Sequence, residues 1–293
     1  MSRSPTSKSG LYMAGFRALE SCKPEGERLL YDPFATAFLS RFLQTIFAAC
    51  TLPVARKLFS SYIQLRWPGV FTAAVARTKL IDDMIIHAVE KEGINQVIIL
   101  SASYDTRAHR LKIGAPLHYV EVDHPEVQLN KRKILSELLE IPVIPVDYIP
   151  LNMGEEGMSE VIDQLLNRKH YKTLFLWEAL TTWEEAREAE AIFRYISSFA
   201  SGTQVIITYL DRAPLDNPKA YPGFSRIYRT LRRAGEKWDY GLRPKDIHQF
   251  MEAHHMQIRY DAGADQYRAL YFGEESRHMK GYEYFRIVRG EVK

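Results

Sequence analysis

The sequence predicts a doubly wound α/β domain in which a mostly parallel sheet of seven strands is covered by helices on both faces. Two observations support this prediction. From about residue 95 onward, short apolar runs rich in β-branched residues alternate with amphipathic stretches, which is typical of buried parallel strands joined by helices. The chain has 293 residues, 46% hydrophobic and 26% charged, which is the size and composition of an ordinary globular protein.

Seven segments have the composition of strands, and four have the spacing of helices. The expected strands are Gln96–Leu100, Leu117–Val122, Val143–Val146, Thr173–Trp177, Thr203–Leu210, Met256–Tyr260 and Tyr282–Arg289. The expected helices between and after them span residues 125–140, 155–169, 184–200 and 244–255. Repeated units of this kind wind into an open sheet through right-handed crossovers.

The first ninety residues do not follow this alternation. They predict three helices, at 33–48, 53–66 and 71–92, which would cap the sheet edge or the mouth of a ligand site. The most apolar stretch, 34–50, is shorter than the ~20 residues that span a bilayer. A core or lid helix is therefore favoured there over a helix lying in a membrane surface.

No flexible linker interrupts the chain, so we expect one domain with four parts. These are a helical cap (1–92), a ligand-binding core (93–210), an insertion or lid (211–243), and a last helix with two strands (244–293). The segment 211–243 departs from the alternation because prolines precede a basic run.

Composition excludes several functions. The net charge of +3, from 39 basic and 36 acidic residues, argues against a general nucleic-acid binder, which needs a concentrated basic face. Cys22 and Cys50 are the only cysteines, too few for a disulfide framework or a thiolate metal cluster, and we expect no metal. No targeting signal is evident, so we expect a cytoplasmic protein without stable membrane insertion. The oligomeric state stays open.

Candidate ligand residues follow the expected strands. In an open parallel sheet, ligands bind outside the carboxyl ends of the strands. The segment Ser101–Arg107 follows the first strand with small residues that let a ligand approach the backbone. Asp123 ends the second strand, where a carboxylate accepts hydrogen bonds from a ribose diol. Asp147 and Tyr148 follow the third strand and suit an amine donor and a stacked base, and Glu178 follows the fourth.

A purely structural role is the alternative for each of these acids. An aspartate that closes a strand is often the N-cap of the next helix, and Asp123 stands two residues before Pro125, as such a cap would. Taken together with the small-residue turn, the acids favour a nucleoside-like ligand.

A set of motifs in a fixed order adds a resemblance to these patterns. The motifs are Arg17–Ser21, Tyr31–Ala35, Arg77-Thr78 with Ile81–Asp83, Ser101–Arg107, Glu121–Glu126, Pro145–Asp147, Phe175–Thr181 and Gly241–Pro244. In these motifs the chain resembles the leucine carboxyl methyltransferase family of S-adenosyl-L-methionine-dependent O-methyltransferases, especially its small-molecule branch, from about Arg17 onward. The resemblance implies the Rossmann-like class I methyltransferase fold and methyl transfer to the oxygen of a carboxylate or hydroxyl group.

The resemblance also implies roles for individual residues in binding S-adenosyl-L-methionine. Arg77 would pair with its methionine carboxylate, and the loop Ser101, Ala102 and Ser103 would lie along its methionyl part. Asp123 would hold the ribose hydroxyls, Asp147 would accept from the adenine amine with Tyr148 covering the base, and Glu178 would face the ammonium group. No catalytic residue is assigned.

The chain departs from the family pattern in that loop. The family has glycine where Ser101 and Ser103 stand, and usually leucine where Tyr148 stands. If the loop needs positive φ, a non-glycine residue costs on the order of 1 kcal/mol there. A repurposed enzyme of the same fold and a non-catalytic binding protein therefore stay as alternatives.

The acceptor site is expected between the N-terminal helices and the insertion. Arg226, Arg229 and Arg233 share one helical face, which is either a solvated surface or a site for an anionic acceptor such as a carboxylate or phosphate. Apolar side chains at the same mouth would suit a hydrophobic small molecule. They are Phe38, Phe42, Ile46 and Phe47. A carboxylate acceptor needs no general base, whereas a hydroxyl acceptor does.

Overall fold

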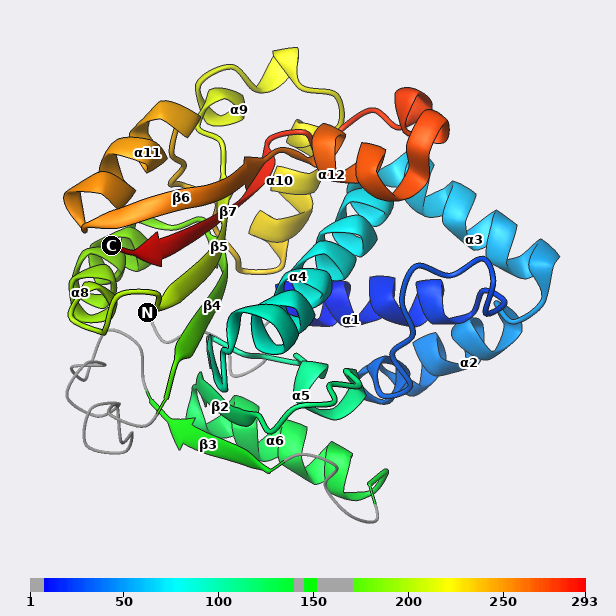
Figure 1. The fold of residues 1–293 in the computed structure, drawn as a ribbon. Helices are drawn as coiled ribbons and strands as arrows, with labels where there is room; N and C mark the ends of the chain where they lie inside the picture. Colours follow the sequence, from blue (N-terminus) through cyan, green and yellow to red (C-terminus); the bar gives the residue numbers. More distant parts are fainter. Residues whose placement is uncertain (1–7, 140–144, 152–170) are drawn as a thin grey trace.

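Seven strands form one sheet in the order β3-β2-β1-β4-β5-β7-β6 in the computed structural model, which describes residues 8–139, 145–151 and 171–293 (Figure 1). The strands are β1 (Gln96–Leu100), β2 (His118–Asp123), β3 (Val146–Pro150), β4 (Thr173–Leu180), β5 (Gln204–Leu210), β6 (Met256–Ala262) and β7 (Phe285–Val292). The first five run parallel, and β7 is antiparallel to both β5 and β6. The strand order reverses between β1 and β4, which is where an open sheet of this kind binds ligands. The predicted fold class is confirmed.

Alternating side chains of the central strands fill two cores on opposite faces of the sheet. Val97 and Ile99 of β1 face one core, and Ile98 and Leu100 face the other, as the twofold repeat of a strand requires. Helices α1 (Lys8–Ser21), α4 (Val70–Glu92) and α12 (Ala264–Phe272) cover the first face. Helices α8 (Trp183–Ser197) and α11 (Pro244–Ala253) cover the second (Figure 1).

The helical cap differs from its prediction in two places. The helix expected at 33–48 is divided into η1 (Ala35–Phe38) and α2 (Arg41–Ala49), because Ser40 caps α2 by accepting from the amide of Leu43. Helix α3 (Pro53–Arg66) follows as expected. Helix α1 is an addition to the prediction, and most residues of its second half are buried against the core. No helix within the described residues is long and apolar enough to cross a membrane.

The third strand is displaced from its prediction. It begins at Val146, where the expected strand ended, and continues through the buried Ile149 to Pro150. The next residue, Leu151, is buried as well. The amide of Leu151 donates to the carbonyl of Asp123, which aligns the ends of the two strands. Residues 143 and 144 and the helix expected at 155–169 lie outside the described residues.

The segment between β5 and α11 leaves the sheet and returns to the same point. It holds α9 (Ala213–Asp216), η3 (Pro218–Ala220) and α10 (Phe224–Arg233). Asp211 then pairs with Leu242 in an isolated bridge, and the amide of Leu242 donates to the carbonyl of Leu210. A Cβ on Gly241 would lie 2.9 Å from that carbonyl oxygen, so the return needs glycine. The division of the chain into cap, core, insertion and C-terminal part stays a prediction.

Helices α5 (Arg107–Arg110) and α6 (Pro125–Ser136) complete the central part of the fold. Helix α6 is the expected helix after the second strand. Between β6 and β7 lie α12 and η4 (Gly273–His278), which the sequence analysis did not predict.

Candidate functional site

The loop after β1 has the backbone that the family's glycines would favour. Ser101 has φ of 53° and Ser103 has φ of 46°, so both serines occupy the left-handed region. The Oγ of Ser103 is buried without a hydrogen-bond partner in the described part of the chain. The loop therefore keeps its backbone conformation although both glycines are absent, and it carries strain at both positions.

Replacing Ser101 or Ser103 by glycine is expected to raise the free energy of unfolding, by about 1 kcal/mol for each. Glycine removes the strain of the left-handed conformation, and this gain exceeds the greater chain entropy that glycine gives the unfolded state. Urea denaturation of each variant measures the change. Ser61→Gly is the matched control: Ser61 is exposed in the interior of helix α3, so glycine there should destabilise by about 0.5 kcal/mol. If the glycine variants of the loop lowered the free energy of unfolding as the control does, the two serines would not be strained.

Asp123 joins the loop to the end of β2. Its carboxylate accepts hydrogen bonds from the backbone amides of Ser103 and His124. The N-cap of α6 is His124, whose Nδ1 accepts from the amide of Glu126, so the capping alternative for Asp123 does not hold. The carboxylate of Asp123 therefore lies at the carboxyl edge of the sheet, beside the loop that has serine where the family has glycine. The prediction that Asp123 binds a ribose requires this position.

Arg77 is a buried arginine whose guanidinium makes few hydrogen bonds within the protein. Its side chain is 4% exposed, and its guanidinium lies over the ring of Phe285, 4.5 Å from the centroid. Nε is 3.4 Å from Oε2 of Glu178, and Nη2 donates to the sulfur of Met13. Nη1 makes no hydrogen bond of ordinary geometry in the described part of the chain. The hydroxyl of Tyr282 nevertheless faces this guanidinium, whose charge and hydrogen bonding act against the burial that raises the pKa of Tyr282. A buried guanidinium in this state is suited to a carboxylate from outside the protein.

A bulge in β4 directs Glu178 toward this arginine. The pairing of β4 with β5 shifts register between Trp177 and Leu180. Ala179 there has φ of 72°, and its amide donates to the side-chain Oγ1 of Thr208 on β5. Glu178 consequently lies between two arginines, 3.4 Å from Nε of Arg77 and 2.9 Å from Nη1 of Arg107. Its side chain is 27% exposed, so it is the group of this cluster that solvent or a ligand reaches.

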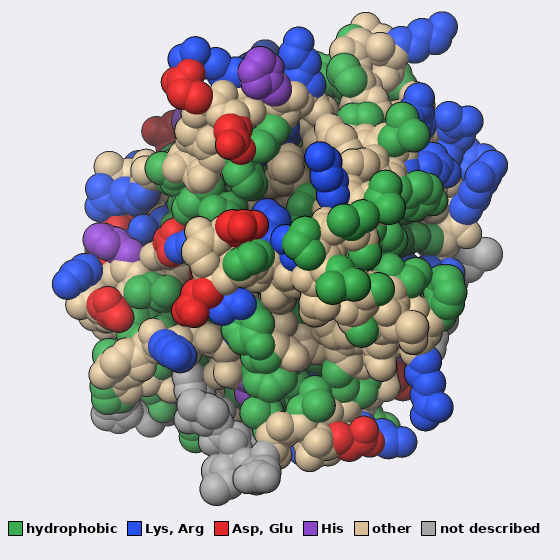
Figure 2. Space-filling view, turned by 90° about the vertical axis from the view of Figure 1, so that its right-hand side faces the viewer, with side chains coloured by type: hydrophobic (Ala, Val, Ile, Leu, Met, Phe, Trp, Pro, Cys, Tyr) green, Lys and Arg blue, Asp and Glu red, His purple; other side chains and the backbone are tan. Residues whose placement is uncertain are grey.

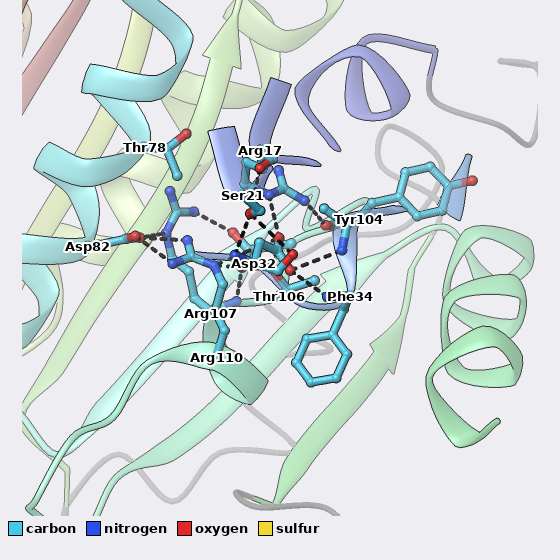
Figure 3. Close-up of polar contacts among 12 residues, drawn as sticks. Arg17, Ser21, Asp32, Phe34, Thr78, Asp82, Tyr104, Thr106, Arg107 and Arg110 are labelled. Carbon is cyan, nitrogen blue, oxygen red and sulfur yellow. Dashed lines mark hydrogen bonds and ion pairs between the residues drawn. The ribbon is translucent and has the colours of Figure 1, made fainter. Parts of the chain in front are cut away.

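A buried ion-pair network extends from Glu178 through Arg107 to the helical cap. Figure 3 shows the part of it that includes Arg107, Asp82 and Asp32. Arg107 Nε donates to Asp82 at 2.7 Å, and both terminal nitrogens of Arg110 donate to the same carboxylate at 2.6 and 2.9 Å. Arg110 also donates to Oγ1 of Thr106, which in turn donates to Asp32 at 2.6 Å. The network thus links α4, α5 and the chain before η1.

Arg17 closes the network on the side of α1. Its Nε donates to Asp32 at 2.7 Å, and its Nη2 donates to the carbonyl of Tyr104 in the loop after β1 (Figure 3). The other oxygen of Asp32 accepts from the amides of Phe34 and Ala35 and begins η1. Five of the eight motifs that carry the family resemblance therefore meet in one cluster. They are Arg17–Ser21, Tyr31–Ala35, Arg77 with Ile81–Asp83, Ser101–Arg107 and Phe175–Thr181. No role was expected for Arg17, Asp32, Asp82, Arg107 or Arg110.

The electrostatics of the network favour ionised carboxylates. Burial alone would raise the pKa of Asp105, but Arg107, Lys131 and a backbone amide lower it to about 2. Burial acts in the same direction on Asp32, and Arg17 and Arg110 outweigh it and lower its pKa. Charged arginines and carboxylates alternate along the network, so each buried charge has an opposite neighbour.

A second buried pair lies behind the loop. Lys131 Nζ is 2.6 Å from Oε2 of Glu121, and both side chains are almost completely buried. Burial raises the pKa of Glu121 to about 7, against the lowering effect of Lys131. Burial and Lys131 together lower the pKa of His109 to about 4, so His109 is neutral at physiological pH.

Asp147 and Tyr148 do not lie at the strand end, and that part of their prediction was wrong. Asp147 pairs with Val120 in the register of β3 on β2, whereas Asp123 pairs with Pro150. The Asp147 carboxylate is exposed and lies 2.7 Å from Nε2 of His118. The Tyr148 hydroxyl lies 3.4 Å from Nε2 of His109, and burial raises the pKa of Tyr148. The predicted strand ends too early, because apolar side chains continue past Asp147 at Tyr148, Ile149 and Leu151.

The three arginines expected to bind the acceptor lie on the solvent-exposed side of α10. Arg226, Arg229 and Arg233 are all exposed on α10, whose opposite side packs on the core through Phe224, Ile227 and Leu231. Arg226 donates to the carbonyl of Leu65 at the end of α3, and Arg229 donates to its own helix. Their role in acceptor binding stays a prediction.

The apolar side chains proposed for the same mouth are divided. Phe38 packs on Tyr104 with ring centroids 5.0 Å apart, and Phe47 is buried against Phe59. Ile46 is partly buried, whereas Phe42 points outward and is exposed. These four side chains therefore do not line one surface.

The sequence matches a known family over most of its length. The model of the leucine carboxyl methyltransferase family matches residues 10–197. A relative from Frankia alni, named as a proposed S-adenosyl-L-methionine-dependent methyltransferase, is 28% identical over 228 residues, which cover 76% of this chain and 75% of the relative. A relative from Parafrankia with the same description is 26% identical over 66% of this chain. The chain spans only 59% of that relative's length.

Two solved structures share the fold. A DUF574-family protein from Streptomyces avermitilis superimposes with a TM-score of 0.56 at 11% identity, covering 96% of this chain and 97% of that one. A proposed methyltransferase from Thermobifida fusca superimposes with a TM-score of 0.50 at 15% identity, covering 82% of this chain and 88% of that one. At such identities the likeness concerns the fold alone.

Proposed function

The chain belongs to the leucine carboxyl methyltransferase family, and from this we propose that it binds S-adenosyl-L-methionine and transfers its methyl group to an oxygen atom of a small organic acceptor. The relatives named above carry the first part of the proposal by their names. The position of the charged cluster, at the carboxyl ends of the strands where the strand order reverses, supports it independently.

The arrangement of Arg77 beside Glu178 is the observation that carries the proposal. The methionyl end of S-adenosyl-L-methionine bears a carboxylate next to an ammonium group. Arg77 offers its buried guanidinium to the carboxylate, in competition with the hydroxyl of Tyr282, and Glu178, 3.4 Å from Arg77 and partly exposed, offers a carboxylate to the ammonium group. Opposite charges placed side by side match a zwitterion in this orientation.

The loop and β2 would hold the rest of the cofactor. Ser101, Ala102 and Ser103 would lie along its methionyl part, and Asp123 would hold the ribose hydroxyls from the end of β2. Asp123 already accepts two backbone amides, which fix the orientation of its carboxylate. We assign no adenine-binding acid, because Asp147 lies three residues before the strand end.

We further propose an anionic acceptor, in agreement with the carboxyl group in the family's description. When bound, the cofactor supplies a methyl group on a sulfonium, and the acceptor oxygen forms the new bond as the sulfur takes the old bonding pair. A carboxylate acceptor is already a nucleophile, so the chain needs only to align it with the methyl carbon and exclude water. A hydroxyl acceptor would also need a base to remove its proton.

Calorimetric titration with S-adenosyl-L-methionine and with S-adenosyl-L-homocysteine tests the first part of the proposal. We expect one binding site for each. A screen with methyl-labelled cofactor against carboxylic acids and phenols tests the second part. A labelled carboxylate ester releases volatile methanol in base, whereas a labelled ether does not, so the assay separates the two acceptor classes. Absence of binding would overturn the proposal.

A binding protein or a repurposed enzyme of the same fold is the second candidate, favoured by the two strained serines. Their side chains occupy space along the loop where the family has none. Cofactor binding without transfer to any acceptor would support this candidate.

A further inference from the structure

Helix α3 exposes a second apolar stripe in addition to the side that packs on the protein. Val54, Leu58, Tyr62 and Leu65 are 73%, 67%, 57% and 76% exposed. Their spacing places them along one side of the helix over about 16 Å. On another side of α3, Ile63 is buried and Phe59 packs edge-on against Phe47 of α2. We call the four exposed residues the α3 stripe.

Neighbouring side chains extend the stripe into a surface. Leu52, which precedes α3, is 64% exposed, and Phe42 of α2 is 74% exposed. Hydrophobic side chains accordingly gather on the face that α2 and α3 present, with lysine and arginine side chains toward its edge (Figure 2). A contiguous exposed apolar surface of this kind marks a place where another apolar surface binds.

The charges around the stripe are nearly all positive. The sequence contains no aspartate or glutamate from residue 33 to residue 81. Arg41 and Lys57 are exposed on the two helices, and Arg66 ends α3. A carboxylate does approach α3 at Glu27, whose Oε2 lies 4.0 Å from Nη2 of Arg56.

Helix α10 adds further positive charge at the end of the stripe. Arg226 donates to the carbonyl of Leu65, the last residue of the α3 stripe. Arg229 and Arg233 follow on the same side of α10 and are exposed. The arginine face that the sequence analysis singled out therefore adjoins the apolar stripe.

We propose that the α3 stripe and its basic border bind the surface of an anionic lipid bilayer. In such a complex, α3 lies in the plane of the interface, the stripe enters the boundary between headgroups and acyl chains, and the basic side chains contact the headgroups. A second copy of the chain fits less well, because two basic borders facing each other would repel. The proposal adds an interaction to the proposed methyl transfer and does not depend on it.

Sedimentation with lipid vesicles tests this proposal. We expect the protein to bind vesicles of phosphatidylglycerol mixed with phosphatidylcholine, to bind phosphatidylcholine vesicles much more weakly, and to lose affinity as salt is added. In the double variant Leu58→Gln with Leu65→Gln, the partition coefficient should fall at least about tenfold, since two apolar anchors are removed. Replacing Arg41 and Lys57 by glutamine should weaken the binding and reduce its salt dependence.

Two other exposed leucines provide the matched control. Leu129 of α6 and Leu270 of α12 are 70% and 62% exposed, and both lie on helices that contribute nothing to the α3 stripe or its basic border. Leu129→Gln with Leu270→Gln should bind vesicles as the unsubstituted chain does, and thermal unfolding should show both double variants to be folded. Failure to bind anionic vesicles at low salt, or equal binding by both double variants, would overturn the proposal. So would a lipid-free dimer in sedimentation equilibrium that only the α3 variant dissociates, because it would assign the surface to a second copy.

Discussion

Replacing Asp82 by asparagine is expected to lower the free energy of unfolding by about 3–5 kcal/mol, the cost of removing one partner from a buried ion pair. Asp82 accepts from three guanidinium nitrogens of Arg107 and Arg110, and its side chain is 5% exposed. An asparagine leaves two buried arginines without this carboxylate and adds a donor that faces them. Urea denaturation measures the loss as a lower midpoint, provided that the dependence of the unfolding free energy on urea concentration is unchanged.

The adjacent residue supplies the control for this experiment. Asp83 lies next along α4, but its side chain is 40% exposed, where it pairs with Lys79 and accepts from the hydroxyl of Tyr271. Asp83→Asn should cost about 1 kcal/mol or less, because the interaction is half-exposed. Similar losses at both positions would show that the network does not depend on the buried charge.

Replacing Arg77 by glutamine is expected to weaken the binding of S-adenosyl-L-methionine about a hundredfold or more. The proposed contact joins a buried guanidinium to the methionine carboxylate, and each charge-assisted hydrogen bond contributes about 1.5–3 kcal/mol. Glu178 keeps its contact with Arg107 in this variant, so no carboxylate is left without a cation. Calorimetric titration measures the change in affinity.

Two comparisons make the result specific to the carboxylate. Methylthioadenosine has the nucleoside and the thioether but lacks the amino acid end, so its affinity should be the same for Arg77→Gln and the unsubstituted chain. Lys79→Gln, two residues along α4 and paired outward with Asp83, should bind both ligands normally. A parallel loss of both ligands in Arg77→Gln would mean that the arginine supports the fold rather than the ligand.

The sequence predicts the sheet well and the charged cluster poorly, for a physical reason. Strands such as β1 and β5 are apolar on both faces, so composition alone locates them to within a residue. Asp123 is the last residue of β2, as predicted, whereas Glu178 lies inside β4, two residues before its end, and not after it. The structure brings Arg77 beside Glu178, as the resemblance implies. These positions depend on local pattern and on known strand geometry.

The remaining features depend on contacts between distant segments. Arg17 and Asp32 meet Thr106, which is 74 residues after Asp32 in the chain. No spacing rule connects residues so far apart. The bulge at Ala179 likewise depends on the hydroxyl of Thr208, 29 residues later, and the sequence of β4 alone does not indicate it. The shift of β3 is different, because it has a local signal: apolar side chains continue after the predicted strand end at Val146, at Tyr148, Ile149 and Leu151.

The return of the chain at Gly241 has a consequence for how this protein can diversify. Because residues 211 and 242 pair with each other, the excursion between them leaves the sheet and rejoins it at the same place. Lengthening such a loop changes its closure entropy only slightly, about 0.6 kcal/mol for each doubling. Residues added at the exposed turns of the excursion would therefore leave the ends of β5 and α11 in place, whereas replacing α10 would also remove the core contacts of Phe224, Ile227 and Leu231.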